Sequence, residues 1–240
     1  RQSTPSPLSN SGCLPYYGSS YRPGNEYHRV ADRPVDNQQD SEINQKARPG
    51  ETLPLQDGEL ILYRDILPDA EECLLRLRDD LPWRQDHLTL GRRIIALPRL
   101  QCWHGEPHCH YSYSRLALDP LPFTPLLQRL RELAAEVAGG PFNCVLCNYY
   151  RDGRDSVGWH ADDEPELGPE PLIASYSFGA TRRLHLRRKD VHGTRLHLDL
   201  PHNSLLVMRG ALQRCWQHQI PKTASSPARI NLTYRYISHP

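Results

Sequence analysis

His160 and Asp162 carry side chains of the kind that bind transition metals, and they lie two residues apart. Their segment, residues 157–164, has the character of a strand end, where residues two apart point to the same side. An imidazole nitrogen and a carboxylate oxygen can therefore reach a single ion. His218, within the strand-like segment 215–220, is the best candidate for a third ligand. Two histidines and one carboxylate leave one face of the metal open, which suits non-haem Fe(II) oxygenases.

The His-x-Asp pair is not specific by itself, because such pairs usually lie on protein surfaces. A second polar cluster strengthens the interpretation. On a strand, Arg229, Asn231, Thr233 and Arg235 share one face of the segment. Two arginines and an asparagine can bind a small dicarboxylate, since arginine pairs bidentately with carboxylates. An exposed strand with its polar residues outward would give the same alternation.

Asn148 and Tyr150 form a third cluster at the end of another predicted strand. They also lie two residues apart, so their polar ends share a face and can complete a carboxylate-binding pocket. An ordinary strand end before the turn at Asp152-Gly153 remains the alternative.

The residues that must position these clusters are predicted to be mostly strands. Eight short strands are expected over 142–150, 157–162, 172–178, 181–188, 195–200, 204–208, 216–220 and 229–237. Many short strands separated by turn signals favour a β-sandwich or a jelly-roll barrel. The sequence therefore predicts an α+β fold that is mainly β, with the helices packed outside the barrel.

The predicted helices precede the strand-rich region. A strand is expected over 59–63, followed by a helix that begins near Pro68 and ends at 81–83. The inner stripe of that helix is predicted to consist of Leu74, Leu75 and Leu77. A second amphipathic helix is expected over 125–138, ended by two glycines. Its predicted apolar face consists of Leu126, Leu127, Leu130, Leu133, Ala134 and Val137.

Residues 1–50 are rich in Ser, Pro, Asn, Gln and Gly, and they lack apolar periodicity. Such a segment cannot bury enough surface to offset its ordering entropy, so a flexible extension is predicted before a domain spanning 51–240. The formal net charge of +1 excludes a supercharged nucleic-acid binder, although a local basic face remains compatible with it. The chain begins with Arg1 instead of methionine, which leaves open a native N-terminus further upstream.

The seven cysteines are odd in number and scattered, unlike a secreted disulfide framework. Cys144 and Cys147 have a metal-like spacing, but they lie in a predicted buried strand and are interpreted as core residues. Four further cysteine and histidine side chains in the segment 102–110 could form a zinc site, although their spacing matches no common zinc module. That group consists of Cys102, His104, Cys109 and His110.

Taken together, the ordered motifs make the sequence similar to a known family. From about residue 57 to 237 it resembles the AlkB family of Fe(II)- and 2-oxoglutarate-dependent dioxygenases, and within it the DNA-repair homologues. The resemblance rests on Asn148-x-Tyr150, His160-x-Asp162 followed by Asp163-Glu164, the segment Ser175-Tyr176-Ser177-Phe178-Gly179-Ala180, His218, and Arg229-x5-Arg235. It implies a double-stranded β-helix, that is, a jelly-roll core.

The resemblance also implies the role of each site residue. His160, Asp162 and His218 would hold Fe(II), while Arg229 would bind the distal carboxylate of 2-oxoglutarate. Arg235 and Asn231 would support the end of the cosubstrate that chelates iron, and Asn148 and Tyr150 would complete its pocket. Dioxygen is the further cosubstrate. The implied reaction oxidises an N-methyl group, which then leaves as formaldehyde.

Nucleotide recognition is expected in the region of about 85–118. By the same resemblance, Tyr111 and Tyr113 would stack on the target base, which must then leave the duplex stack. Asp163 and Glu164 could accept hydrogen bonds from its exocyclic amine. A hairpin is expected at 87–91, although it lacks an aromatic tip. Phosphate contacts are predicted from Arg92, Arg93, Arg99, Arg187, Arg188 and Lys189.

Three function classes follow. The first is an enzyme that demethylates 1-methyladenine and 3-methylcytosine in DNA, in repair of alkylation damage. The second is the same chemistry on RNA, a protein or a small molecule, and the third is a jelly-roll binding module with an incidental metal site. The expected partner is alkylated DNA, with RNA as the other nucleic acid, and a monomer without membrane association is expected. No secretory signal pattern is present, so the expected location is intracellular: cytoplasmic in a bacterium, nuclear in a eukaryote.

Overall fold

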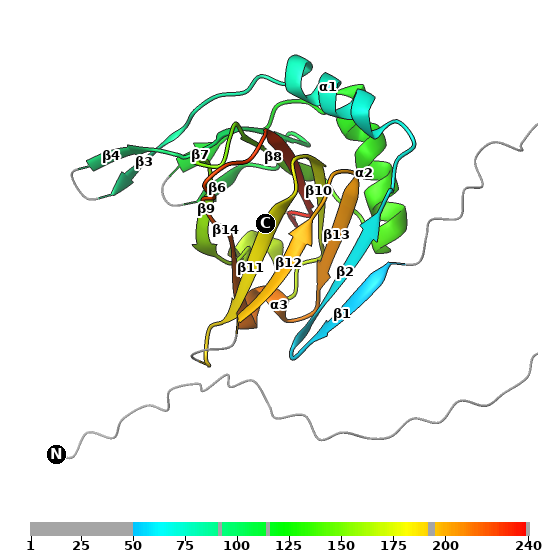
Figure 1. The fold of residues 1–240 in the computed structure, drawn as a ribbon, viewed down its shortest axis with the longest axis vertical. Coiled ribbons are helices and arrows are strands. Elements are labelled where there is room, and N and C mark those ends of the chain that lie inside the picture. Colours follow the sequence, from blue (N-terminus) through cyan, green and yellow to red (C-terminus); the bar gives the residue numbers. More distant parts are fainter. Residues whose placement is uncertain (1–49, 91–92, 114–115, 192–194, 239–240) are drawn as a thin grey trace, which may run out of the picture. The chain divides into compact units, whose positions relative to one another are not determined.

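The computed structural model describes residues 50–90, 93–113, 116–191 and 195–238 (Figure 1). The predicted extension lies outside these ranges except for Gly50, so its character stays a prediction. None of the helices within the described ranges has the length and apolarity needed to cross a bilayer.

A seven-stranded antiparallel sheet forms the larger half of the fold. Its strands, in spatial order, are β1 (Glu51–Leu55), β2 (Gly58–Arg64), β13 (Ser204–Arg209), β10 (Ile173–Gly179), β15 (Arg229–Arg235), β8 (Cys144–Tyr150) and β5 (Leu100–Gly105). Strands distant in sequence lie side by side, as where Arg229 pairs with Tyr150 and Asn231 with Asn148. This register places two of the predicted site clusters on neighbouring strands.

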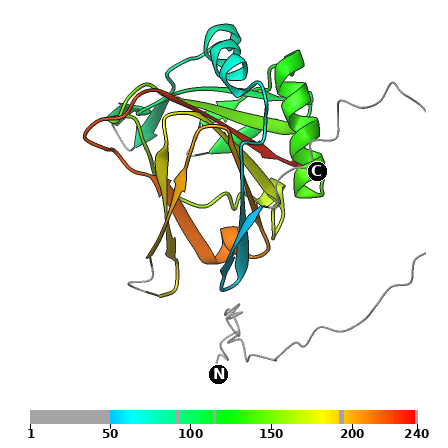
Figure 2. The same cartoon turned by 45° about the vertical axis from the view of Figure 1, so that its right-hand side comes forward.

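A four-stranded antiparallel sheet packs against one face of the larger sheet (Figure 2). Its strands are β12 (Arg195–Leu200), β11 (Arg182–Arg188), β14 (Trp216–Ile220) and β9 (Val157–His160). Residues of β11 alternate between inward and outward, and the inward Leu184 and Leu186 pack against Leu60, Leu62 and Leu206 of the larger sheet. The predicted jelly-roll fold, mainly β, is thereby confirmed.

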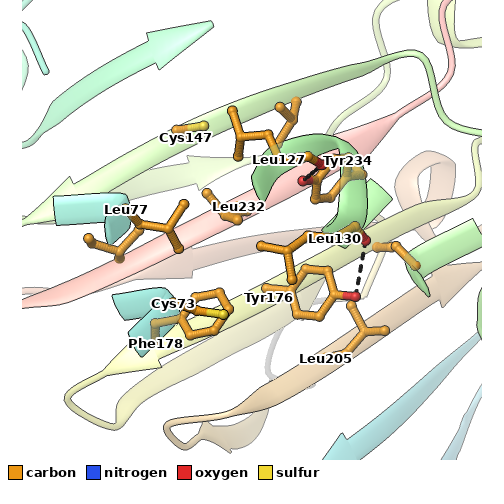
Figure 3. Packing of buried hydrophobic residues seen from close by; sticks show 14 of the residues in the cluster. Cys73, Leu77, Leu127, Leu130, Cys147, Tyr176, Phe178, Leu205, Leu232 and Tyr234 are labelled. Carbon is orange, nitrogen blue, oxygen red and sulfur yellow. Dashed lines mark hydrogen bonds between the residues drawn. The ribbon is translucent and has the colours of Figure 1, made fainter. Parts of the chain in front are cut away.

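Two helices, α1 (Ala70–Asp80) and α2 (Pro125–Ala138), cover the other face of the larger sheet (Figures 1 and 2). Their buried side chains meet those of the central strands in one apolar cluster (Figure 3). Two buried tyrosines anchor the sheet to α2. The hydroxyl of Tyr176 donates to the carbonyl of Leu130 at 3.2 Å, and that of Tyr234 to the carbonyl of Leu127 at 2.7 Å. The predicted placement of the helices outside the barrel is therefore confirmed.

The inner face of α1 differs from the predicted leucine stripe. Ala70, Cys73 and Leu77 are the buried residues of the helix, whereas Leu75 is 49% exposed. These three positions follow the helical repeat along one face, and Leu75 lies on another. The small residues Ala70 and Cys73 let the helix approach the sheet closely, and a count of large apolar residues overlooks them.

The helix α2 forms where it is predicted, because both of its ends carry strong signals. The hydroxyl of Thr124 accepts a hydrogen bond from the backbone of Leu127 at 3.2 Å, and Pro125 occupies the first turn. Gly139 ends the helix in the left-handed conformation, with φ of 75°, which glycine adopts without steric cost.

The predicted strands from residue 142 onward are all present, with ends that differ by at most two residues. The predicted hairpin also forms, with β3 (His87–Leu90) paired to β4 (Arg93–Ala96). A second small hairpin joins β6 (Tyr111–Tyr113) to β7 (Leu116–Leu118). Elements without a sequence prediction of their own include β1, β5, β7, the 3₁₀ turn η1 (Pro165–Leu167) and the short helix α3 (Leu212–Cys215). Such short elements depend on tertiary contacts more than on their own periodicity.

Candidate active site

The three predicted metal ligands lie together at one end of the small sheet. His160 ends β9 and pairs in register with His218 of the neighbouring β14. Asp162 follows two residues after His160, and its carboxylate lies 3.8 Å from the Nε2 atom of His160. One ligand atom from each of the three residues lies within 4.8 Å of the others. Separations of this size allow all three to coordinate one ion.

Hydrogen bonds to the surrounding protein orient the ligands. The Nδ1 atom of His160 donates to the carbonyl of Gly158 at 2.8 Å, so the Nε2 lone pair is the one left to bind a metal. The backbone N–H of Asp162 donates to the side chain of Gln213 at 3.0 Å. The guanidinium of Arg235 donates to the Asp162 carboxylate, with an Nη2–Oδ2 distance of 2.9 Å. The triad is therefore positioned by residues from α3 and β15.

The electrostatics of the triad favour the protonation states that bind a metal. Burial alone would raise the pKa of Asp162, but the positive charge of Arg235, together with His218 and His160, lowers it to about 2. Burial lowers the pKa of His218 to about 3, since its charged form is poorly solvated there. A carboxylate and a neutral imidazole are accordingly the forms present near neutral pH.

These pKa values predict how the stability of the metal-free protein depends on pH. His218 has a pKa of about 3 when folded against a model value of 6.5, so the unfolded chain binds the extra proton between these values. The free energy of unfolding should therefore fall as the pH is lowered from 6.5 towards 3. Asp162 adds to this loss as the pH falls from 3.8 towards 2. Urea unfolding with a chelator present measures the effect, and a His218→Asn protein with an unchanged pH profile would contradict it.

A cavity of about 610 Å³ extends from the triad between the two sheets. Polar residues of the larger sheet line one side of it, including Asn148, Tyr150, Arg229 and Asn231. The opposite wall contains apolar side chains such as Leu184 and Ile220. All five sequence-predicted cosubstrate residues, Arg235 included, therefore line the same cavity as the metal triad.

Arg229 is the residue of this cavity that most directly indicates a ligand. Its side chain is 1% exposed, and its Nη2 atom donates to the hydroxyl of Ser177 at 2.9 Å. Within the described part of the chain, its Nε and Nη1 atoms have no hydrogen-bond partner. A buried guanidinium with unsatisfied donors is costly unless an anion binds it. The N–H donors of a guanidinium form a planar fork, which a carboxylate matches in charge and in geometry.

The residues around Arg229 are held by their own hydrogen bonds. The amide nitrogen of Asn231 donates to Ser175 at 2.8 Å and to the carbonyl of Tyr176 at 2.7 Å. The ring centroid of Tyr150 lies 5.2 Å from the Arg229 guanidinium carbon, within the range of a cation–π contact. The slot that would bind a carboxylate, formed by Arg229, Asn231 and Tyr150, is therefore in place before any ligand binds.

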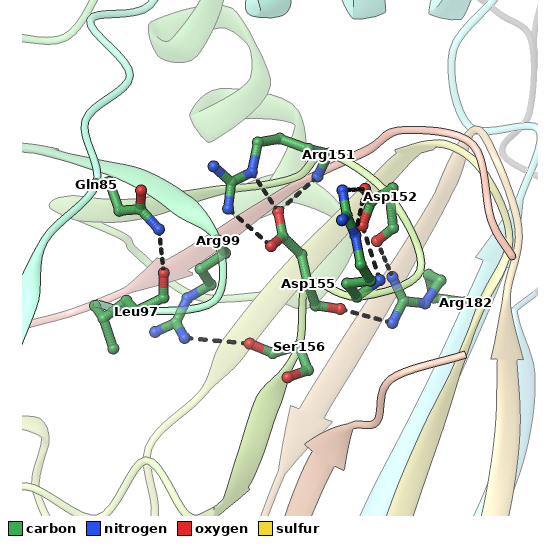
Figure 4. A network of polar contacts seen from close by, with 9 residues as sticks. Gln85, Leu97, Arg99, Arg151, Asp152, Asp155, Ser156 and Arg182 are labelled. Carbon is green, nitrogen blue, oxygen red and sulfur yellow. Dashed lines mark hydrogen bonds and ion pairs between the residues drawn. The ribbon is translucent and has the colours of Figure 1, made fainter. Parts of the chain in front are cut away.

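A polar network fixes the loop between β8 and β9, which leads from the cosubstrate residues to His160 (Figure 4). Arg151 donates to the carboxylate of Asp155 at 2.7 and 2.9 Å. The buried Arg182 donates to the carbonyls of Asp152 and Asp155, at 3.3 and 3.0 Å. Because the loop is tied at several points, the position of His160 relative to Tyr150 is well defined.

Comparison with known proteins decides which family carries this arrangement. A family model described as the 2OG-Fe(II) oxygenase superfamily matches residues 59–235. The chain belongs to the 2OG-Fe(II) oxygenase superfamily. The superfamily implies Fe(II), 2-oxoglutarate and dioxygen as cofactor and cosubstrates. The triad fits the metal, and Arg229 with its unsatisfied donors fits a carboxylate of 2-oxoglutarate.

Relatives of this chain support the AlkB resemblance. It is 42% identical over 181 residues to the alpha-ketoglutarate-dependent dioxygenase alkB homolog 3 of Rattus norvegicus, covering 71% of this chain and 61% of that protein. It is 43% identical over 151 residues to the DNA oxidative demethylase ALKBH2 of Mus musculus, covering 59% and 63% respectively. The chain thus spans about three fifths of the length of these relatives. The solved structure of OsALKBH1 matches with a TM-score of 0.58 at 16% identity, over 78% of this chain and 100% of that chain, which shows a common fold.

The predicted substrate residues are only partly brought together. Glu164 lines the cavity. Asp163 instead forms an ion pair with Lys189 at 2.8 Å, and its side chain is 55% exposed. Tyr111 and Tyr113 belong to β6, but their side chains lie outside the described part of the structure. Trp159, which had no predicted role, lines the cavity, and its ring centroid lies 4.3 Å from the guanidinium carbon of Arg187.

Two of the predicted phosphate contacts are wrong, because their side chains are buried. Arg99 is 5% exposed, and its guanidinium donates to the side chain of Asn148 at 2.8 Å. It therefore supports the cavity wall, where it cannot reach an external phosphate. Arg188 is also buried and pairs with Asp57 and Asp190. Of the other four, Arg92 lies outside the described residues, and Arg93, Arg187 and Lys189 remain predictions.

Several residues that position the candidate active site had no role in the sequence prediction. Ser175 and Ser177 hold Asn231 and Arg229, and both lie in the Ser-Tyr-Ser-Phe motif. The alternation of small polar and aromatic residues in that motif was a usable signal, because it places both serines on one face. Gln213 gave no signal, since it reaches Asp162 from an unpredicted short helix.

The alternative zinc site predicted in the segment 102–110 is not formed as a group of four. Cys109 donates instead to the carbonyl of Asn143, and His110 pairs on the surface with Asp119. Cys102 and His104 do lie together, but the residue that joins them is Cys147 of the neighbouring strand. Spacing within one segment could not reveal a partner supplied by strand pairing.

Proposed function

We propose that this chain is an Fe(II)- and 2-oxoglutarate-dependent dioxygenase that oxidatively demethylates N-alkylated bases in DNA. The substrates proposed are 1-methyladenine and 3-methylcytosine, with formaldehyde as a product of the repair reaction. The observation that carries the proposal is the meeting of the His160, Asp162 and His218 triad with the unsatisfied Arg229 guanidinium in one cavity. The similarity to proteins named as dioxygenases and DNA oxidative demethylases supports the choice of substrate.

The chain's own residues have distinct tasks in this proposal. His160, Asp162 and His218 would hold the iron, which together with 2-oxoglutarate and dioxygen supplies the oxidising chemistry. Arg235 keeps Asp162 ionised through their 2.9 Å contact. Arg229 binds a carboxylate of 2-oxoglutarate and, with Asn231, fixes its direction within the slot. The apolar wall of the cavity limits the entry of water, and this strengthens each of the polar contacts inside.

A base must reach the cavity from outside the sheets. Since a paired and stacked base cannot enter a pocket between two sheets, the substrate is single-stranded or has its target base flipped out. Trp159 and Glu164 line the cavity, and in this proposal they contact such a base, one by stacking and one by hydrogen bonding. We further propose that the protein acts as an intracellular monomer whose partner is alkylated DNA.

Formaldehyde release tests this function. The protein is incubated with Fe(II), 2-oxoglutarate and oligonucleotides that carry 1-methyladenine, in single-stranded DNA, double-stranded DNA and RNA. We expect turnover on DNA that requires both iron and 2-oxoglutarate and that is lost in His160→Ala. Binding of 2-oxoglutarate without turnover on any methylated DNA would instead favour RNA, a protein or a small molecule as substrate. DNA binding that persists without any turnover, and equally in His160→Ala, would favour a binding module.

A further inference from the structure

A second group of metal-binding side chains lies on the other face of the larger sheet, towards the helices. Cys102 and His104 lie two residues apart on β5, so they share a face. Cys147 of β8 lies directly opposite Cys102 in the antiparallel register. One sulfur or nitrogen atom from each of the three residues lies within 4.8 Å of the others. The group therefore has the compactness of the iron triad, without sharing a residue with it.

The three side chains are shielded from solvent. Cys102 is 2% exposed, His104 is 2% exposed and Cys147 is fully buried. Both cysteines belong to the apolar cluster between the sheet and the helices, in which Figure 3 shows Cys147. An ordinary core position of this kind is expected to hold an apolar side chain, and an imidazole there needs partners for both nitrogens.

Only one of the two ring nitrogens of His104 has such a partner. Nδ1 lies 2.7 Å from the carbonyl oxygen of Pro122, so it is the nitrogen that donates. Nε2 then carries the lone pair, and among the described residues it has no hydrogen-bond partner. A buried acceptor nitrogen beside two sulfur atoms is the donor set of a metal site, in which the hydrogen bond from Nδ1 fixes the ring.

Two simpler explanations account for the buried histidine less well than a bound cation does. If the cysteines are plain core residues, the Cys102 thiol is the neighbour left for Nε2, and a thiol is only a weak hydrogen-bond donor. If Cys102 and Cys147 form a cross-strand disulfide, the same atom loses even this donor. A cation uses all three side chains at once. It also offsets the negative charge of two buried thiolates, which would otherwise be costly.

We propose that Cys102, His104 and Cys147 bind a thiophilic d¹⁰ cation, Zn²⁺ or Cu⁺. Thiolate and imidazole ligands select such ions, whereas the histidine and carboxylate triad suits Fe(II). Three ligands suffice for Cu⁺, and Zn²⁺ would take one more, such as a buried water molecule. The ion would join β5 to β8 just beside Asn148, so it is a structural support behind the cosubstrate slot.

Cobalt serves as the probe, because Co²⁺ bound to thiolates gives a charge-transfer absorption that histidine and carboxylate ligands do not give. The reduced, metal-free protein is titrated with Co²⁺ and then with Zn²⁺ or Cu⁺. We expect one equivalent of thiolate-bound cobalt, displaced by either ion. The absorption should be lost in Cys147→Ser and retained in His160→Ala, which removes an iron ligand. Metal analysis of the protein as purified then shows which of the two ions it acquires in the cell.

The matched control is Cys73→Ser. Cys73 is 1% exposed and lies in the same apolar cluster, but it is not part of the metal-binding group. This variant should therefore keep the thiolate absorption. The proposal is overturned if the wild-type protein shows no thiolate-to-cobalt absorption, or if the absorption persists in Cys147→Ser. Peptide mapping that finds Cys102 linked to Cys147 in protein that takes up no thiolate-bound metal would also overturn it. The wild-type titration tests the proposal by itself, even if the Cys147→Ser protein does not fold.

Discussion

An Asp162→Ala protein should bind no iron tightly, should release no formaldehyde, and should be about 3–5 kcal/mol less stable than the wild type. Two effects combine in this substitution. The triad loses its single anionic ligand, and the Arg235 guanidinium loses its buried partner at 2.9 Å. Both side chains are nearly inaccessible, at 4% exposed each, so solvent cannot replace the lost contact. Iron binding, formaldehyde release and urea unfolding measure the three outcomes.

The neighbouring carboxylate provides the control for this prediction. Asp163 is exposed at the surface. Among the described residues, its one ion pair is with Lys189. An Asp163→Ala protein should therefore keep both iron binding and stability, because exposed pairs contribute little. Equal loss of iron in the two variants would contradict the assignment of Asp162 as the ligand.

An Arg229→Gln protein should show a KM for 2-oxoglutarate raised by about 30-fold or more. Removing one side of a buried charge pair costs at least about 2 kcal/mol, and each 1.4 kcal/mol is a factor of ten. Glutamine can still bond to Ser177, but it offers neither a positive charge nor a fork of donors. The measurement is the dependence of formaldehyde release on the concentration of 2-oxoglutarate, together with direct binding in the absence of oxygen.

Arg183→Gln is the matched control for Arg229. Arg183 is exposed on β11 and pairs with Asp199 at 2.6 Å, away from the cavity. Its replacement should leave the KM for 2-oxoglutarate unchanged. An unchanged KM in Arg229→Gln as well would show that the cosubstrate binds elsewhere, while iron binding by the triad would remain a separate result.

The local patterns of the sequence were enough to predict the architecture and the triad. Turn residues and the alternation of apolar side chains marked each strand from residue 142 onward, and capping signals marked α2 at both ends. His160 and Asp162 lie two residues apart, so the strand repeat alone implied that they face one point. His218 was selected as the third ligand because it lies in a strand-like segment, and the resemblance to a family implied the same residue. In the structure, the pairing of β9 with β14 brings it to the other two residues.

Residues whose roles depend on long-range pairing could be found only in the tertiary structure. Arg99 was expected at the surface and lies in the cavity wall, because β5 pairs with β8 and brings it to Asn148. The same strand pairing gives Cys102 and His104 their third partner, Cys147, from another segment. The sequence determined which residues alternate on each strand, since that depends on local backbone geometry. The tertiary structure decided which strands became neighbours, because that depends on how the whole chain buries its apolar surface.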